Sequence, residues 1–248
     1  MPSDFLHNFM DQKWEDLLLI HWPVAQVRVQ ETLPDDLRVD LFEEQAWLSV
    51  VGFRLSGLKI APFRWIQWPG FWEINLRTYV KDKNGRKGIW FYSLDSSDLF
   101  AVIGARILYG LHYNYARTDG RIKDNQIFFH SERKYPHNQA NSEFFADLSA
   151  GKHSRKTKKT GLDTFLLERY RFWSRRKLSR FSESAKVRHV PYQSIKVKTA
   201  RYKGELFKSQ GFDEPTEAPV LGHYCKGFEV QATAPSWLLS TAGQANQR

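Results

Sequence analysis

Between residues 73 and 80 the chain alternates residues that can do chemistry with residues that are mostly apolar. Successive side chains of a β-strand point to opposite faces, so this alternation predicts a strand with one polar and one apolar face. At roughly 3.3 Å per residue, the six steps from the first polar residue to the last would make the polar face about 20 Å long. It carries an acid, an amide, a guanidinium and a phenol, which are Glu73, Asn75, Arg77 and Tyr79.

These four groups suit the recognition of a small anion. The planar guanidinium of Arg77 can bind a carboxylate or a phosphate through two parallel hydrogen bonds. Asn75 offers a further hydrogen bond, and Tyr79 offers a phenol on an apolar ring. Glu73 becomes a candidate catalytic residue, a general base, if burial raises its pKa. The alternative is an internal network of ion pairs that only supports the fold.

The segments that follow would position this polar face. Asn84-Gly85 is typical of a tight hairpin turn with positive φ angles. The nearly continuous apolar run at 89–94 predicts a buried strand that returns beside the first. Residues 95–98 supply side-chain oxygens that can cap a helix over Leu99–Tyr109, and Gly110 suits the end of that helix. The sequence therefore predicts a hairpin followed by a helix.

The rest of the chain is interpreted mainly as strands. A short helix is predicted from residue 3 or 4 through Trp14, a turn at 33–36, an ordered loop at 61–70 and one helical turn at 162–166. Strands are expected at 17–20, 38–42, 46–55, 113–118, 126–133, 167–173, 187–202 and 227–232. Many strands and few helices favour an α+β fold of mainly antiparallel β structure with a closed or strongly curved sheet.

Length and composition limit the organisation of the chain. The 248 residues could form one large domain or two small ones, and we expect a single domain over 1–239, followed by a disordered tail at 240–248. The single cysteine, Cys225, suits a reducing compartment. The N-terminal residues do not resemble a signal peptide, and no apolar run is long enough to span a bilayer. We therefore expect a cytoplasmic protein without a membrane partner.

The formal charge of +10 is concentrated in one region. Residues 152–180 hold eleven Lys and Arg against two acids, and 151–161 is expected to be a mobile loop. Such a region can bind a polyanion, so a nucleic-acid partner is possible, although a solvated loop is favoured and no known nucleic-acid-binding motif is present. No nucleotide-binding, hydrolase or metal-ligand motif occurs, so no cofactor and no metal are predicted.

Several motifs, taken together and in order, resemble the YqjF-like family of bacterial domains of unknown function. The resemblance covers about residues 16–232. The motifs are LLLIHWPV (17–24), LPDDLRVDLFEEQAWLSVVGFRL (33–55), EINLRTYV (73–80), GIWFYSLD (88–95), GARILYGLHYNYA (104–116), LLERYRFW (166–173) and HVPY (189–192).

That family is similar in fold to acetoacetate decarboxylase, which implies a cone-shaped β-barrel with the pocket inside. Acetoacetate decarboxylases carry a proline and two lysines at the end of a glycine-containing run, and one lysine forms a Schiff base with the substrate. In the similar run here, residues 104–115, His112, Tyr113 and Asn114 stand in those places. None of them can form an imine, so the resemblance does not carry this activity over. Glu73 is similar to a glutamate that faces the lysine in those enzymes.

A pocket of this kind could include further residues. Ligand contacts are expected from the helix, from the segment after it and from the later strand, through Arg106, His112, Tyr113, Tyr115, Glu168 and Arg169. His21 and His189 are interpreted as packed, hydrogen-bonding residues.

Three functions remain open on the sequence alone. The first is binding of a small anionic or aromatic carboxylate or carbonyl compound, which we favour. The second is an enzyme that performs acid-base chemistry on such a compound, so enzyme status is undecided. The third is polyanion binding through residues 152–180.

Overall fold

The computed structural model describes residues 8–135, 140–149, 159–176 and 179–239. Helices are few within these residues: α2 (Gln26–Gln30), α3 (Leu99–Tyr109), α4 (Gly161–Leu167), the 3₁₀ turn η2 (Lys208–Gln210) and a helical turn at 236–239. The strands are β1 (Met10–Val24), β2 (Leu37–Val39), β3 (Ala46–Ile60), β4 (Phe71–Asp82), β5 (Lys87–Ser96), β6 (Tyr113–Lys123), β7 (Gln126–Tyr135), β8 (Ser142–Asp147), β9 (Arg171–Ser174), β10 (Glu183–Arg188), β11 (Ser194–Lys196), β12 (Thr199–Gly204) and β13 (Leu221–Ala232).

Seven strands form a closed ring, in the order β5, β9, β10, β13, β1, β3 and β4. The pairing of β4 with β5 closes the ring. Neighbouring ring strands are antiparallel except for β5 and β9, which run parallel. Closure leaves these strands without a free hydrogen-bonding edge, as in other curved sheets. This arrangement is the mainly antiparallel, strongly curved sheet that the sequence predicts.

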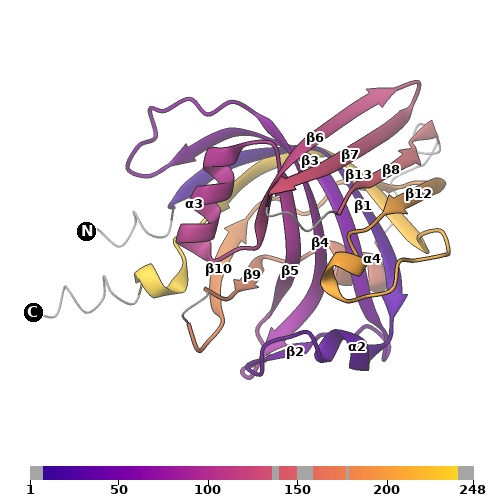
Figure 1. Cartoon of the computed structure of the whole chain (residues 1–248), viewed down its shortest axis with the longest axis horizontal. Helices are drawn as coiled ribbons and strands as arrows, with labels where there is room; N and C mark the ends of the chain where they lie inside the picture. The colour runs from indigo at the N-terminus through magenta and orange to yellow at the C-terminus, as the bar shows by residue number, and fades with distance from the viewer. Residues whose placement is uncertain (1–7, 136–139, 150–158, 177–178, 240–248) are drawn as a thin grey trace, which may run out of the picture.

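The sheet continues outside the ring through β6, β7, β8 and β12. β6 pairs with β5 in parallel, and the long hairpin of β6 and β7 extends past the ring in Figure 1. Two glycines allow this extension to pack closely on the ring. A Cβ atom at Gly52 would lie 2.6 Å from the ring of Phe129, and one at Gly120 would lie 2.6 Å from the ring of Trp72.

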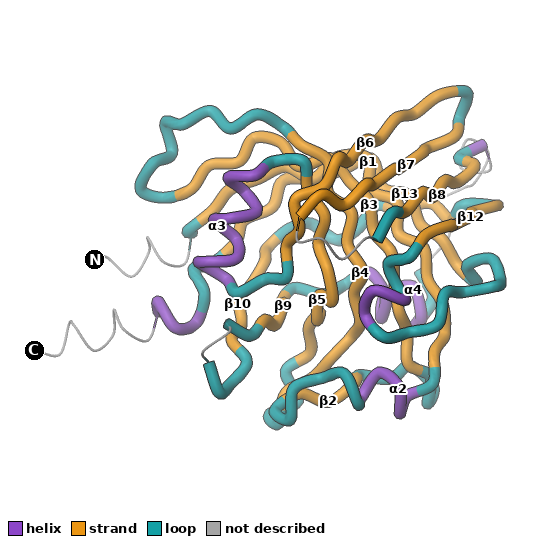
Figure 2. Tube along the Cα trace, viewed as in Figure 1, coloured by secondary structure: helices purple, strands orange, loops and turns teal. Residues whose placement is uncertain are grey.

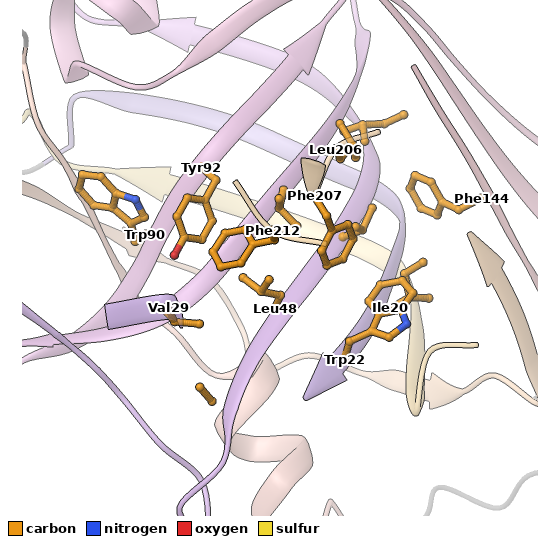
Figure 3. Packing of buried hydrophobic residues seen from close by; sticks show 14 of the residues in the cluster. Ile20, Trp22, Val29, Leu48, Trp90, Tyr92, Phe144, Leu206, Phe207 and Phe212 are labelled. Atoms are coloured by element: carbon orange, nitrogen blue, oxygen red, sulfur yellow. The ribbon is translucent and has the colours of Figure 1, made fainter. Parts of the chain in front are cut away.

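The largest apolar core lies between the ring and the segments that cover it. Ring residues such as Ile20 and Leu48 pack there against Phe144 of β8 and against Phe207 and Phe212 near η2 (Figure 3). The apolar face of β4 contributes to this core, while its opposite face looks into the ring. Because both faces are covered, every residue from 73 to 80 is buried.

The helices lie at the periphery of the strands (Figure 2). Asp98 caps α3 by accepting a hydrogen bond from the backbone N–H of Ala101 at 2.7 Å, and Gly110 ends the helix with φ of +67°. Thr160 and Asp163 form a reciprocal capping box at the start of α4. The described helices include none that is long and apolar enough to cross a membrane.

Several sequence predictions need correction. The helix predicted through Trp14 is wrong where the structure describes it, because Met10–Val24 is one strand. Of the turn residues only Gly85 has positive φ, at +73°, because the turn is longer than two residues. The strand predicted at 167–173 begins later, since α4 extends through Leu167. Strand β8 and helix α2 were not predicted, while residues 151–158 of the basic loop and the tail at 240–248 lie outside the described residues.

Candidate functional site

A cavity of about 170 Å³ lies inside the ring. All seven ring strands contribute side chains to its wall, and the wall is mainly apolar. Trp68 and the inner side of α3, from Phe100 to Leu108, form the wall at one end. The aromatic residues contributed by strands are Trp14, Phe53, Phe71, Phe91, Phe172 and Tyr113. Such a wall suits a ligand with an apolar or aromatic body.

Glu73 lies in this wall and is only 3 % exposed. It accepts a hydrogen bond from the hydroxyl of Tyr113 at 2.5 Å and one from the side-chain amide of Asn75 at 3.1 Å. Burial raises the pKa of Glu73 to about 7, although both hydrogen bonds and the charge of Arg77 act in the opposite direction. At neutral pH this group can therefore either accept or donate a proton.

Arg77 lines the same cavity and is 4 % exposed. Its Nε and Nη2 atoms are buried and have no hydrogen-bond partner among the described residues. A buried guanidinium normally has a carboxylate or several carbonyl groups around it, because desolvating a charge without compensation is costly. The two nitrogens of Arg77 can therefore donate hydrogen bonds to a carboxylate.

Arg169, which also lines the cavity, is bound in a different way. Its Nη1 donates to Asp40 at 2.7 Å, and its Nε donates to the carbonyl of Phe165 at 2.8 Å. The guanidinium also stacks 4.3 Å from the centre of the Phe165 ring. Because the charge of Arg169 is compensated by Asp40, Arg169 is less suited than Arg77 to bind an anion.

A chain of hydrogen bonds lies next to Arg77 inside the ring. The chain runs from Asp163 of α4 to His223 (3.0 Å), from His223 to His21 (3.1 Å) and from His21 to Ser49 (2.7 Å). Ser49 then contacts the hydroxyl of Tyr79 at 2.8 Å. All five side chains are buried.

Arg77 lies beside this chain in the sheet, and its charge affects the pKa of His21. It is the register partner of Ser49 across β3 and β4, and Tyr79 lies two residues further on the same face. Burial, then the neighbouring His223 and the charge of Arg77 lower the pKa of His21. Burial would raise the pKa of Asp163, but its hydrogen bonds, including those with Thr160 and His223, lower it to about 2.

A second buried ion pair lies between β5 and β7. Asp95 accepts hydrogen bonds from Arg133 at 2.8 and 3.1 Å, from Asn114 at 2.9 Å and from Ser131 at 3.1 Å. The side chains of Asp95 and Arg133 are fully buried. These residues hold the extension against the ring, and this cluster was not predicted from the sequence.

Of the predicted ligand contacts, Glu73, Arg77, Tyr113 and Arg169 line the cavity. Asn75 supports Glu73, and Tyr79 belongs to the buried chain next to Arg77. The structure therefore brings the polar face of β4 together with the cavity. That these residues contact a ligand stays a prediction.

The other four predicted contacts lie away from the cavity wall. Arg106 is exposed on α3, and His112 meets Trp90 edge to face. Tyr115 packs beside the small apolar cluster that includes Val102. Glu168 forms an ion pair with Lys159. Arg106 lies away from the cavity because it is on the side of α3 that faces solvent, and Glu168 because β9 begins only at Arg171.

The chain of His21, His223 and Asp163 was not predicted as a unit from the sequence. His21 and His223 are 202 residues apart in sequence and meet only because β1 pairs with β13. The interpretation of His21 as a packed, hydrogen-bonding residue is confirmed. No sequence spacing would have indicated its partners.

Comparisons with known proteins agree with the fold. The chain is 33 % identical over 224 residues to the uncharacterized protein YqjF of Bacillus subtilis (strain 168), and the match covers 89 % of each chain. Acetoacetate decarboxylase from Legionella pneumophila has a similar structure, with a TM-score of 0.59 at 11 % identity, covering 92 % of this chain and 87 % of that one.

Two further solved structures are similar. An acetoacetate decarboxylase-like enzyme from Sphingomonas wittichii RW1 gives a TM-score of 0.59 at 13 % identity, covering 95 % of this chain and 96 % of that one. The enduracididine biosynthesis enzyme MppR complexed with pyruvate gives 0.54 at 9 % identity, covering 94 % and 90 %. At these identities the likeness establishes the fold alone. The model of the DUF2071 family, described as an uncharacterized conserved protein, matches residues 11–229, and the chain belongs to this family.

Proposed function

We propose that the protein binds a small organic acid inside the ring, with the carboxylate on Arg77 and the apolar body against the cavity wall. The observation that carries this proposal is the buried guanidinium of Arg77, two of whose nitrogens have no partner in the part of the chain that the structure describes. A bound carboxylate would supply two hydrogen bonds and the missing countercharge at once.

The cavity also limits the size and shape of the ligand. Its volume of about 170 Å³ is small beside the 300–1,000 Å³ of sites for drug-sized molecules. Its aromatic wall favours a flat or aromatic body. The enduracididine biosynthesis enzyme was solved with pyruvate, a small carboxylate of the class proposed here.

A second candidate is acid-base catalysis on such a ligand, and the pKa of Glu73 near 7 favours it. With the carboxylate on Arg77, Glu73 would face the other part of the ligand from the same strand. An imine mechanism is not part of this proposal, because the described residues that line the cavity include no lysine. Glu73 would instead move a proton to or from a carbon or oxygen next to a carbonyl group.

Polyanion binding through residues 152–180 stays a third, less favoured prediction. Part of that charge is neutralised within the protein, since Lys159 pairs with Glu168 and Arg176 with Glu183. Its affinity should fall steeply with added salt, unlike the affinity of the cavity.

The test is a panel of thermal-shift measurements with aromatic carboxylates, small oxo acids, sugar acids, phosphorylated metabolites and a short DNA duplex. Benzoate and its neutral isostere benzamide form the sharpest pair in the panel. A carboxylate at about 100 times its dissociation constant should stabilise the protein by roughly 2.7 kcal/mol.

We expect benzoate, but not benzamide, to stabilise the wild type, and we expect Arg77→Ala to lose this effect. Arg54→Ala is the matched control, because Arg54 is exposed on the neighbouring strand β3. Unchanged carboxylate affinity in folded Arg77→Ala would overturn the assignment. Consumption of any bound acid, lost in Glu73→Gln, would move the conclusion from a binding protein to an enzyme.

A further inference from the structure

The chain from Asp163 to Tyr79 continues to the backbone of α4, where the hydroxyl of Tyr79 contacts the carbonyl of Leu166 at 3.1 Å. It therefore contains five contacts in series, each of which needs one hydrogen. With Asp163 ionised and both histidines neutral, the two histidines, Ser49 and Tyr79 supply one hydrogen each. Four hydrogens cannot complete five hydrogen bonds, so one contact is left unmade.

One added proton completes the chain. If His223 carries hydrogens on both nitrogens, it donates to Asp163 and to His21. His21 then donates to Ser49, Ser49 donates to Tyr79, and Tyr79 donates to the carbonyl of Leu166. Every contact is satisfied, and the new positive charge lies 3.0 Å from the carboxylate of Asp163. The five contacts can therefore accommodate one proton more than the neutral groups carry.

Burial and nearby positive charges oppose this proton. Five charged or titratable groups face the two histidines. They are Arg77 and Tyr79 of β4, Asp163 of α4, Lys196 of β11 and Lys159, which directly precedes the N-cap of α4. Of the cations, Lys196 is bound to Asp163 and Lys159 to Glu168. Arg77 is the one with buried nitrogens that have no partner in the described residues.

We propose that the chain Asp163–His223–His21–Ser49–Tyr79 is a proton-binding site coupled to Arg77, so that a carboxylate that binds to Arg77 brings one proton into this chain. The inference rests on the proposed function, because it assigns a second event to the same site. The carboxylate stays ionised and neutralises Arg77, which removes the positive charge that opposes protonation of the histidines. The proton comes from solvent, and no covalent bond of the ligand changes.

Two experiments test this coupling, and the first needs no ligand. The imidazole signals of His21 and His223 are titrated by NMR in the wild type, in Arg77→Met and in Arg77→Lys. Because Arg77→Met removes the charge, we expect the pH midpoint of the histidine pair to rise by about one unit. Arg77→Lys keeps the charge and should leave the midpoint near that of the wild type. Equal midpoints in wild type and Arg77→Met would overturn the proposal.

The second experiment measures proton uptake directly. Benzoate is titrated calorimetrically at pH 7 in buffers with different ionisation enthalpies, using Glu73→Gln to remove the other group that titrates near this pH. We expect uptake of up to about half a proton per benzoate, which is the most that a one-unit rise in the midpoint allows, and an affinity that increases by less than tenfold per unit as the pH falls. His21→Asn and Asp163→Asn should each reduce the uptake to nearly zero, whereas His130→Asn, at an exposed histidine of β7, should not change it.

The outcomes separate this proposal from the proposed function. Benzoate that binds to Arg77 without proton uptake, in the presence of intact histidines, supports the carboxylate site and overturns the coupling. If the pH midpoint of the histidines rises in Arg77→Met but benzoate does not bind to the wild type, the result supports the coupling and argues against aromatic carboxylates as the ligand class.

Discussion

Glu73 and Arg77 lie on the same face of β4, four residues apart, and differ in how the protein satisfies them. Glu73 accepts hydrogen bonds from two buried side chains, whereas the Nε and Nη2 atoms of Arg77 have no partner among the described residues. A protein selected only for stability would not keep a buried cation in this state. The contrast supports the proposal that Arg77 binds the carboxylate of a ligand.

Arg77→Met should stabilise the ligand-free protein by about 1–3 kcal/mol. The substitution replaces an uncompensated buried charge by an apolar side chain of similar length, which fits the apolar cavity. The same variant should lose affinity for carboxylates, as expected where function and stability conflict. Chemical denaturation in urea measures the change in the free energy of unfolding.

Arg169→Met is the matched comparison for that prediction. It removes the shorter of the two ion pairs of the buried carboxylate of Asp40 and leaves only the 3.7 Å contact with the exposed Lys87, so it should destabilise the protein by about 3–5 kcal/mol. The two arginines line the same cavity, and the opposite signs follow only from their partners. Similar losses of stability in both variants would show that Arg77 has a partner in solution.

Glu73 should make stability depend on pH between about 4.5 and 7. The pKa of Glu73 is raised from 4.5 to about 7 in the folded protein, chiefly by burial, so the folded state binds more protons than the unfolded state in this range. The stability that this group contributes is therefore complete below pH 4.5 and is lost as the pH rises through 7. The full difference corresponds to roughly 3 kcal/mol.

Glu73→Gln isolates this contribution, because the other titrating groups are common to both proteins. We expect the two free energies of unfolding to converge near pH 4.5 and the variant to become more stable than the wild type by pH 8. Parallel stability curves across this range would mean that Glu73 titrates normally and is a poor candidate for proton transfer.

Tyr113→Phe should raise the pKa of Glu73 further. The hydroxyl of Tyr113 donates its hydrogen bond to the carboxylate and stabilises the charged form, so its removal favours the protonated form. We expect the upper limit of the pH range over which stability is lost to rise from about 7 by about one unit, while the lower limit, set by the unfolded state, stays near 4.5. The titration of the Glu73 carboxyl carbon by NMR gives the same quantity independently.

The sequence predicted the local part of this site. Alternation from 73 to 80 correctly indicated a strand whose polar side chains share one face, because side-chain direction in a strand is a local property. The cap at Asp98 and the end of α3 at Gly110 followed from local chemistry in the same way. The turn at Gly85 was located correctly, although its length was not.

The remainder depends on contacts between distant segments. That the Nε and Nη2 atoms of Arg77 have no hydrogen-bond partner among the described residues depends on all the elements packed around them. His21 meets His223 only through the pairing of β1 with β13. The start of the strand Met10–Val24 does not alternate strictly in sequence, because Asp16, with φ of +52°, interrupts its register, so a helix through Trp14 is predicted there instead. Bulges of this kind shift side chains between faces and hide the period of two.

Two glycines should respond to alanine for different reasons. At Gly85, with φ of +73°, a Cβ atom has no neighbour within 4 Å, so Gly85→Ala should cost about 1–2 kcal/mol through backbone strain alone. At Gly120 the φ is ordinary, but the Cβ atom would lie 2.6 Å from the ring of Trp72, so Gly120→Ala should cost about 1–3 kcal/mol through overpacking.

The additional change Trp72→Leu distinguishes the two cases by thermal unfolding. It should recover part of the loss in Gly120→Ala, by making room for the new methyl group, and none of the loss in Gly85→Ala. If the two alanine variants respond alike to it, the extension does not pack on the ring as described.

Asp98 joins the two segments that form one end of the cavity. One carboxylate oxygen caps α3 by accepting from Ala101, and the other accepts from the indole N–H of Trp68 at 2.9 Å. Asp98→Ala should remove both contacts, lowering stability by about 1 kcal/mol through the lost cap and releasing residues 61–70 from the helix. We therefore expect faster proteolytic cleavage within 61–70 under native conditions.

Trp68→Phe separates the two effects, because it removes the indole hydrogen bond and leaves the helix cap intact. It should increase cleavage within 61–70 with little change in helix stability, and a double-mutant cycle with Asp98→Asn should show a coupling of about 0.5–1.5 kcal/mol between the two side chains. If Asp98→Ala and Trp68→Phe both leave cleavage unchanged, residues 61–70 are held by their apolar contacts rather than by this bond. In that case ligand entry at this end of the cavity would depend on movement of α3.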